Sequence, residues 1–562
     1  MKDIYNIEEF KLSPLPNERH IEWYKRDLMA FIHFGMNTFT DKEWGEGDAD
    51  PDLFNPTELD CRQWIKNLKE AGFTSAILTV KHHDGFCLWQ SEYTDYCVKN
   101  SKWKDGKGDV AKEFTDACRE FGMKAGFYLS PWDRHEKTYG TAAYTEYYNN
   151  QLRELLTNYG EIWDIWWDGA GSMGADYDWR KWENTVHSLQ PQAVIFGAMG
   201  SAPVADVRWV GNEKGVAGKP CFANIDESSI IKEITSELNT GKFDGEKFAP
   251  AEVDVSIRPG WFYHKEQDEF VRSPENLMKL YLNSVGRNAG LLLNFPPDKR
   301  GLISEIDIAS AKEFSKNLKN SFENNLLKEA AIKVSSAYSE DYLKENLVDG
   351  NYDSFFAFCL EDKAPFVEFT FNEEKEFNTV KLQEVIEYGH HIKGFKLSAL
   401  IEGEWTTVTE GECVGFTFIE NFGSVKTNKI RLDISAFETL PLIRSVGLYN
   451  VESKNEEKVS FKKDILKLGA AKITRDTYTM DINLGGIYPF NLIKFDSMGL
   501  DSYEVWVFNG TDLEFVEKKE VNKASEEYKF SKIIDYSYRV VLKFTPQSSY
   551  EFIKRNAEIY LV

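Results

Sequence analysis

Residues 162–170 have the sequence Ile-Trp-Asp-Ile-Trp-Trp-Asp-Gly-Ala, a short and mostly apolar run that ends in a carboxylate and a turn. The run follows an amphipathic stretch at residues 144–159, whose apolar residues recur at helical spacing. A short apolar run next to a helical pattern is typical of a buried strand in an α/β fold. Asp168 and Gly169 both favour a turn, so this strand is expected to end just before them.

The same arrangement recurs on both sides of this segment. Helical patterns are found at 61–71, 110–121, 144–159 and 273–285. Repeated alternation of strand and helix predicts an α/β fold with a parallel sheet, and a closed (β/α)8-like TIM barrel over residues 1–325 is the simplest form of that length. The short apolar runs lie at 29–34, 75–80, 124–129, 162–167, 193–196, 207–210 and 291–295.

Beyond residue 330 the helical period gives way to strict alternation of apolar and polar residues. This alternation is clear at 395–399 and 428–434, and it returns at 503–508 and 538–544. Period-two alternation between turn signals is typical of antiparallel strands. The sequence therefore predicts one or two β-sandwich domains after the barrel, one discoidin-like or carbohydrate-binding-module-like at 330–450 and a second β-rich domain at 460–562. The charged segment 452–463 is the expected linker between them.

The composition limits the possible partners. The chain has 562 residues, with 67 Lys and Arg against 91 Asp and Glu, a formal charge of −24. Such an acidic chain is a poor ligand for nucleic acid, which requires clustered positive charge. No apolar run is long enough to span a membrane, so we expect no membrane partner and a soluble chain, cytoplasmic as given, or secreted or periplasmic if a signal peptide has been removed. The seven cysteines form no Cys-x-x-Cys pair and are expected to be reduced thiols.

Aromatic residues make up 14% of the chain, including 15 Trp and 26 Tyr. Their flat apolar faces and polar edges suit sugars, although they could equally fill the core. Five polar or aromatic clusters follow predicted strands. In a parallel barrel the strand ends meet at one face, where active sites lie. The clusters are His33-Phe34-Gly35 with Glu43-Trp44, Lys81 to Phe86, Tyr128 to Asp133, Trp166 to Ala170, and Asp206 to Glu213.

Each cluster taken singly has a structural explanation. Asp168-Gly169 is a common turn, the adjacent His82 and His83 could be ordinary rim residues, and Glu213 could be a solvated loop carboxylate. Their recurrence at strand ends favours a site instead. Two carboxylates, several histidines and no Ser-His or Cys-His pattern point to acid and base chemistry on a carbohydrate, such as glycoside hydrolysis.

A metal site is the main alternative from the residues alone. Its ligands would be His33, His82, His83, Asp84 and Asp168. The His-x-His pair that many barrel metal sites carry on their first strand is missing. We therefore expect neither a metal nor another cofactor.

At these clusters the sequence resembles the family 29 glycoside hydrolases, the retaining α-L-fucosidases, over residues 10–320. The later part resembles a discoidin (F5/8 type C) sandwich over 330–450, through residues 345–350 and 443–449, and resembles it more weakly over 451–562. The motifs that carry the fucosidase resemblance occur in order: His33-Phe34-Gly35, Glu43-Trp44, Lys81-His82-His83-Asp84-Gly85-Phe86, Tyr128-x-Ser130, Trp166-x-Asp168-Gly169, Arg208-Trp209, Pro259-Gly260-Trp261-Phe262-Tyr263 and Leu292-Leu293-Asn294-x-Pro296-Pro297-Asp298.

The resemblance implies that Asp168 is the nucleophile of a covalent fucosyl-enzyme. It also implies a set of residues that bind fucose. Imidazoles, carboxylates and guanidinium groups can bond the ring hydroxyls, and an aromatic face can cover the C6 methyl group. The binding residues carried over by motif are His33, Glu43, Trp44, His82, His83, Tyr128, Trp166, Arg208 and Trp261.

The general acid/base has two candidates. Glu213 follows Asp168 by 213 − 168 = 45 residues, and its context resembles the branch of the family that cleaves α-1,3 and α-1,4 fucose from branched, Lewis-type glycans. Glu252, in Pro250-Ala251-Glu252-Val253-Asp254, is the alternative. We favour Glu213, and a retaining mechanism then requires its carboxyl group to lie roughly 5–5.5 Å from that of Asp168.

The resulting hypothesis is an exo-acting, retaining α-L-fucosidase that acts on fucosylated oligosaccharides or glycans. The alternatives are a fucosidase of broader or α-1,2/1,6 specificity, a non-catalytic glycan-binding protein, and a metal-dependent barrel hydrolase. The predicted β-domains could bind sugar or only support the barrel. The oligomeric state is left open.

Overall fold

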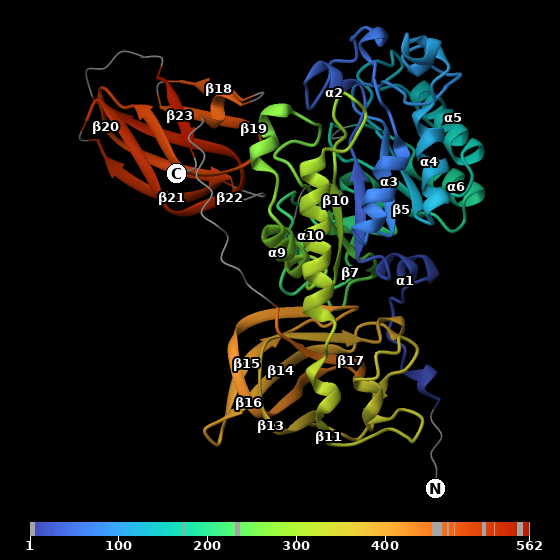
Figure 1. Cartoon of the computed structure of the whole chain (residues 1–562), viewed down its shortest axis with the longest axis vertical. Helices are drawn as coiled ribbons and strands as arrows, with labels where there is room; N and C mark the ends of the chain where they lie inside the picture. The colour runs from blue at the N-terminus through green and yellow to red at the C-terminus, as the bar shows by residue number, and fades with distance from the viewer. Residues whose placement is uncertain are drawn as a thin grey trace.

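A computed structural model of the chain describes residues 6–171, 175–230, 236–451, 464–468, 471–476, 478–508, 513–521, 523–547 and 555–560 (Figure 1). The predicted linker at 452–463 lies outside these residues. An α/β barrel occupies the first part of the chain and two antiparallel β-domains follow it, which confirms the predicted fold class. None of the described helices is long and apolar enough to cross a membrane.

The barrel closes from eight described parallel strands in the order β1-β10-β9-β6-β5-β4-β3-β2. Parallel neighbours place all the carboxyl ends at one face, here called the rim, and all the amino ends at the other, here called the base. The strands are β1 (Leu28–Ile32), β2 (Ser75–Lys81), β3 (Lys124–Leu129), β4 (Asp164–Trp167), β5 (Val194–Gly197), β6 (Val207–Trp209), β9 (Ala251–Ser256) and β10 (Ala289–Asn294).

Seven of these strands coincide with predicted apolar runs, but β9 does not. All six of its residues are buried. Glu252 and Asp254 are carboxylates that interrupt the apolar pattern, although both lie inside the protein, at 0% and 3% exposure. A search for apolar runs misses a strand in which buried acidic residues alternate with apolar ones.

Side chains alternate between the interior of the barrel and the surrounding helices. On β4, Trp166 joins the interior cluster with Phe31 and Tyr128. Its neighbours Ile165 and Trp167 join the cluster that packs between strands and helices. This alternation decides which residues of each strand can reach a site inside the rim.

The predicted helices are confirmed as α3 (Cys61–Glu70), α4 (Val110–Phe121), α5 (Ala142–Asn158) and α9 (Pro274–Asn283). Asp60 and Asp109 cap α3 and α4, because their side chains accept hydrogen bonds from backbone N–H groups of the first turn. Two further helices, α6 (Trp179–Leu189) and α10 (Glu305–Phe322), were not predicted. The short α1 (Glu18–Tyr24) lies at the base and α2 (Met36–Thr40) follows β1 at the rim (Figure 1).

The middle β-domain is built from seven described strands around a separate apolar core. The predicted alternation at 395–399 and 428–434 falls in β14 and β16, and the Glu402-Gly403 turn joins β14 to β15 with positive φ at both residues. The strands are β11 (Ala331–Val334), β12 (Phe356–Ala357), β13 (Phe366–Glu384), β14 (Ile392–Ile401), β15 (Glu404–Gly411), β16 (Phe418–Phe437) and β17 (Leu442–Tyr449).

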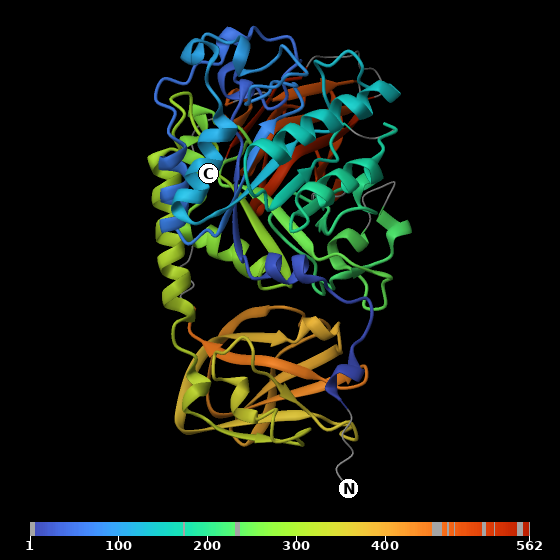
Figure 2. The same cartoon turned by 90° about the vertical axis from the view of Figure 1, so that its right-hand side faces the viewer.

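The C-terminal β-domain has its own core and six described strands. The predicted strands at 503–508 and 538–544 fall in β20 and β22. The strands are β18 (Lys472–Arg475), β19 (Thr479–Asp496), β20 (Leu500–Phe508), β21 (Leu513–Glu520), β22 (Ser525–Pro546) and β23 (Ala557–Tyr560). In two views at right angles the middle domain lies below the base, whereas the C-terminal domain lies at the height of the barrel (Figures 1 and 2).

Candidate active site

Asp168 stands directly after β4, at the rim. Its Oδ2 accepts a hydrogen bond of 2.9 Å from the Tyr128 hydroxyl, and its Oδ1 accepts one of 2.7 Å from the Ala170 N–H. His83 Nε2 lies 3.6 Å from Oδ2. The side chain is still 23% exposed, so it is held in a fixed orientation and remains open to a ligand.

His83 has a defined tautomer. The Ser130 hydroxyl donates to the Trp132 carbonyl at 2.6 Å, so its oxygen is available to accept the proton of His83 Nδ1, at 2.8 Å. The Nε2 atom of neutral His83 is then an acceptor beside Asp168, suited to a donating hydroxyl group. Ser130 belongs to the Tyr128-x-Ser130 motif, and the structure gives it this orienting role.

Two further histidines complete a cluster. His33 Nδ1 bonds Asn294 Oδ1 at 2.9 Å, and His82 Nδ1 accepts from Asn37 Nδ2 at 3.2 Å. The His82 ring stacks on Tyr128, at 5.5 Å between centroids, and lies 4.1 Å from the His83 ring. The three rings thus line one wall, and each is fixed by a partner at Nδ1.

These histidines are neutral at physiological pH. Burial lowers the pKa of His33 to about 3 and that of His83 to about 4, and it moves the pKa of His82 well below its usual value. Neutral imidazoles can both donate to and accept from hydroxyl groups. The wall therefore suits a neutral polyhydroxy ligand.

Glu43 binds the loop that follows β9. Its Oε2 accepts from the Trp261 N–H at 2.8 Å, and its Oε1 accepts from His264 Nε2 at 2.7 Å. Burial disfavours the charged form of His264, but its hydrogen bonds to Glu43 and Asp41 outweigh burial and raise its pKa to about 9. The charged imidazole and the carboxylate hold the Trp261 indole over the cluster, 5.0 Å from the His33 ring.

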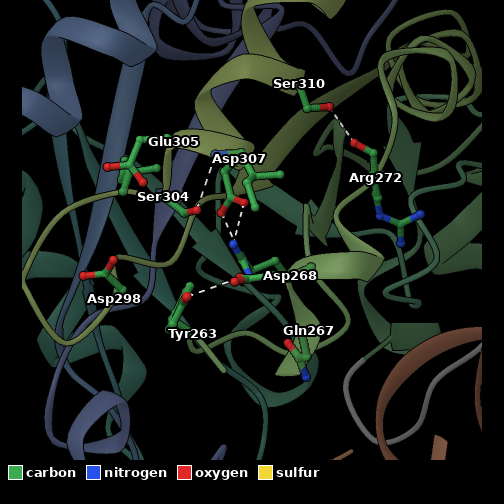
Figure 3. Close-up of polar contacts among 12 residues, drawn as sticks. Tyr263, Gln267, Asp268, Arg272, Asp298, Ser304, Glu305, Asp307 and Ser310 are labelled. Carbon is green, nitrogen blue, oxygen red and sulfur yellow. Dashed lines mark hydrogen bonds and ion pairs between the residues drawn. The ribbon is translucent and has the colours of Figure 1, made fainter. Parts of the chain in front are cut away.

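The same loop is anchored from its other side by a buried ion pair. Arg258, which is 1% exposed, donates to both oxygens of Asp307 at 2.8 Å and to Asp268 Oδ1 at 2.8 Å. The Tyr263 hydroxyl also donates to Asp268 (Figure 3). These bonds fix both ends of the segment that carries Trp261.

Glu213 lies on the loop after β6. Burial, and then the charge of Asp168, raise the pKa of Glu213 to about 7, while a hydrogen bond from the Trp261 side chain opposes the rise. Glu213 therefore lies near both Asp168 and Trp261. Glu213 can keep its proton near neutral pH, and Asp168 is oriented as an acceptor. Such a pair of carboxyl groups can serve as acid and nucleophile.

Trp44 is 54% exposed and meets both His83 and Trp132 edge to face, at 5.8 and 5.6 Å. The exposed Trp44 ring lies at the outer edge of the site, where a ligand can pack against it. Trp166, by contrast, is 5% exposed and lies deeper, stacked on Phe196 at 4.0 Å and on Tyr128 at 5.4 Å. It forms the floor under Tyr128.

The structure does not bring Glu252 to this site. Glu252 is fully buried near the base, where its oxygens accept hydrogen bonds from Trp166 Nε1 at 2.8 Å and Trp23 Nε1 at 3.2 Å. Burial raises its pKa to about 7. Both oxygens accept bonds from indole N–H groups and the residue is buried, so the position of Glu252 favours Glu213 as the candidate acid/base.

Arg208 is also placed elsewhere, which corrects its expected role in binding. It is 0% exposed, and its guanidinium donates to the backbone carbonyls of Phe222 and Leu238, at 2.8 and 2.9 Å. Neighbours on a strand point to opposite sides, so Arg208 faces outward while Trp209 faces the interior. Arg208 thus connects β6 to the segments that pack outside the barrel.

Sequence reasoning missed the residues that support the site. Trp209 Nε1 donates to Asp254 Oδ1 at 2.8 Å, and the charge of Glu213 adds to burial in raising the pKa of Asp254. Asn294 bonds His33 and donates to the Trp261 carbonyl at 2.8 Å, which joins two walls. Both Trp209 and Asn294 stand in the matched motifs, so applying strand alternation within each motif would have identified them.

Among the residues that the structure describes, no three His, Cys, Asp or Glu side chains are arranged to hold a metal ion. Asp84, part of the alternative metal set, accepts a bond from the Phe86 N–H, and burial raises its pKa to about 7.

Comparisons with known proteins identify the family of the barrel and of the middle domain. The family model for alpha-L-fucosidase matches residues 10–323, and that for the F5/8 type C domain matches residues 331–456. Alpha-L-fucosidase 1 of Arabidopsis thaliana is 41% identical over 468 residues, which cover 80% of this chain and 91% of the plant protein.

Two solved structures are similar over different lengths. A putative alpha-L-fucosidase from Bacteroides thetaiotaomicron has a TM-score of 0.77 and 44% identity, with 79% of this chain and 99% of that one covered. A glycoside hydrolase 29 family member from an unknown rumen bacterium has a TM-score of 0.73 and 31% identity, with 98% and 100% covered.

Proposed function

This chain belongs to the α-L-fucosidase family of glycoside hydrolases, and we propose that it is a retaining, exo-acting enzyme that removes α-1,3/1,4-linked fucose from branched, Lewis-type glycans. The observation that carries the proposal is the pairing of Asp168, oriented by Tyr128, with Glu213, whose pKa is raised to about 7.

In this mechanism Asp168 attacks the anomeric carbon while Glu213 gives its proton to the leaving oxygen. A fucosyl ester forms on Asp168 and the fucosylated glycan loses its fucose. Glu213, now a carboxylate, takes a proton from water as the water attacks the ester, which releases fucose and restores both groups.

The coupling between the two carboxyl groups assists this cycle. The charge of Asp168 contributes to the raised pKa of Glu213. That charge disappears when the ester forms, so the pKa of Glu213 falls at the moment when it must act as a base. One residue can therefore serve as the acid in the first step and as the base in the second.

We expect the neutral histidine and tryptophan side chains of the site to bind the substrate. His33, His82 and His83 are suited to the ring hydroxyls, and the rings of Trp44 and Trp261 to the apolar face and C6 methyl group of fucose. Proposed ligands are thus fucosylated oligosaccharides or glycans. The α-1,3/1,4 preference rests on the sequence context of Glu213, at residues 210–215.

The first test uses an aryl α-L-fucoside. Asp168→Ala should lower kcat by roughly 10⁴-fold or more, because no other group can form the ester. Asp178→Ala, which removes a nearby exposed carboxylate from the N-cap of α6, is the matched control and should retain activity. A wild-type rate in Asp168→Ala would disprove the mechanism.

The second test concerns linkage. Lewis-type trisaccharides and 2′-fucosyllactose are incubated side by side with the wild-type enzyme, and released fucose is measured. Cleavage of the trisaccharides alone is the expected result. Cleavage of 2′-fucosyllactose alone would overturn the linkage assignment and leave the fucosidase activity intact, and glycan binding without turnover would support a binding protein instead.

A further inference from the structure

The mechanism above leaves the C-terminal β-domain without a role, although that domain is attached at the rim. Backbone N–H of Ile487 donates to the Pro259 carbonyl at 2.9 Å, and Gln267 Nε2 donates to the Tyr488 hydroxyl at 3.0 Å. Phe270 of the barrel enters the core of the domain and meets the Tyr488 ring edge to face at 5.3 Å. All three barrel residues belong to the loop after β9.

This loop is the one that carries Trp261 into the pocket. Gln267 Oε1 accepts from the Gly260 N–H at 3.2 Å, so Gln267 links Tyr488 of the domain to the residue before Trp261. The buried Arg258–Asp307 ion pair also anchors this loop. The C-terminal domain is therefore held in a fixed position relative to the pocket.

One end of the C-terminal sheet lies next to the loop after β9. In β22, Ser537 pairs with Tyr488, which places the next residue, Tyr538, beside the docking contact. The Tyr538 ring packs on Phe508 at 4.9 Å between centroids and remains half-buried. The pairing thus places a half-buried aromatic residue of the C-terminal domain next to the strand pair that docks on the loop after β9.

Electrostatic interactions agree with this placement. Burial, and then the charge of Glu213, raise the pKa of the Tyr538 hydroxyl. On β21, at the end of the same sheet, the charge of Glu514 acts on Lys214, the residue after Glu213. Charged and titratable groups of the domain and of this short loop thus act on each other.

The position of Glu213 determines what a neighbouring group can contact. A general acid lies next to the leaving oxygen, and fucose fills the pocket on the side of Asp168 and the histidines. A side chain beyond Glu213, on the side away from that pocket, can therefore meet only the part of the substrate that leaves.

We propose that Tyr538 and the adjoining end of the C-terminal sheet form the leaving-group side of the active site, where the Tyr538 ring packs against the sugar to which fucose is attached. An aromatic ring can cover the apolar face of a pyranose, and the hydroxyl group can bond one of its oxygens. This inference rests on the proposed role of Glu213. It makes the C-terminal domain a determinant of glycan selectivity.

The test compares two substrates that share fucose but differ in the leaving group: a Lewis-type trisaccharide and α-L-fucosyl fluoride, whose leaving group is too small to reach Tyr538. In Tyr538→Ala, the ratio of kcat/KM for the trisaccharide to that for the fluoride should fall about tenfold, mainly through KM. That fall equals about 1.4 kcal/mol of transition-state stabilisation.

Matched variants separate this role from folding. Tyr538→Leu keeps an apolar contact with Phe508 but removes the aromatic face, and it should show a similar fall. Tyr538→Phe keeps the ring and should retain most of the ratio. Tyr560→Ala removes a partly buried tyrosine from β23 of the same domain and should leave the ratio unchanged.

An unchanged ratio in folded Tyr538→Ala and Tyr538→Leu would overturn the inference, as would an equal loss on both substrates. Failure of the wild-type enzyme to release fucose from either substrate would instead contradict the proposed function. The two failures are therefore distinguishable.

Discussion

The two β-domains have similar secondary structure but meet the barrel at opposite ends. The middle domain contacts segments that precede strands: Phe416 N–H donates to Asn288 Oδ1 at 2.8 Å, and the Phe416 ring stacks on Tyr24 at 4.7 Å. The C-terminal domain contacts the loop after β9, through Ile487 and Pro259. In a parallel barrel only the second position is next to the chemistry.

A domain's place relative to the strand ends, more than its fold, determines what it can do. At the base, the middle domain can stabilise the barrel or bind glycan on its own surface. At the rim, the C-terminal domain can alter both binding and rate. The following substitutions test this distinction, from the largest expected effect to the smallest.

The largest effect is expected at Glu213, and Glu252, at the opposite end of the barrel, serves as its comparison. Glu213→Gln should lower kcat/KM on a Lewis-type trisaccharide by about 10²–10⁴-fold, because the leaving oxygen loses its proton donor, and should affect α-L-fucosyl fluoride far less. Glu252→Gln, near the base, should have a much smaller effect on the same two substrates.

The pH dependence of kcat/KM provides a second test of which glutamate is the acid. The acid role needs protonated Glu213, whose pKa is raised to about 7, so kcat/KM of the wild-type enzyme on the trisaccharide should fall as the pH rises above about 7. This alkaline limb should vanish in Glu213→Gln and persist in Glu252→Gln, whose glutamate also has a pKa of about 7 in the wild-type protein. The reverse pattern would assign the acid to Glu252.

A smaller effect is expected where the C-terminal domain meets the rim. Gln267→Ala removes the bonds to Gly260 N–H and to the Tyr488 hydroxyl, and so loosens the segment that places Trp261. We expect kcat/KM to fall about tenfold on both substrates, since a small misplacement of binding groups is costly. Tyr488→Phe removes only the partner on the domain and should cause a smaller loss in the same direction.

The smallest effect on activity is expected at the base. Asn288→Ala removes the bonds from Asn288 to the Cys221 carbonyl and Phe416 N–H, at a residue with φ of 60°. The free energy of unfolding should fall by about 1–3 kcal/mol, measured as a lower Tm. We expect kcat/KM to stay within about twofold of the wild-type value. A tenfold loss of kcat/KM at unchanged Tm would contradict the inference that contacts at the base affect stability and contacts at the rim affect activity.

Much of the fold could be predicted from the sequence because the barrel repeats one simple pattern. Apolar runs predict seven of the strands, and amphipathic stretches predict α3, α4, α5 and α9. The eighth strand, β9, could not be found this way because Glu252 and Asp254 are buried acids. No rule of apolar periodicity identifies a carboxyl group that is kept inside by indole N–H donors.

The site was predictable where a residue follows a strand, and less so where it lies within one. Asp168, His83 and Glu213 follow strands and were found at the rim. Arg208 was misjudged because the matched motif contains both Arg208 and Trp209, and only the register shows which of them faces inward. The position of Tyr538 depends on how two domains dock, which local sequence patterns do not encode.

The proposed mechanism requires that Asp168 form a covalent bond to fucose. The most direct test is to incubate the wild-type enzyme with 2-deoxy-2-fluoro-α-L-fucosyl fluoride, which forms the ester quickly but hydrolyses it slowly, and to locate the modified residue by peptide mass spectrometry. A single fluorofucosyl adduct on Asp168 is the predicted result. An adduct on another residue, or turnover of this reagent by Asp168→Ala, would contradict the account.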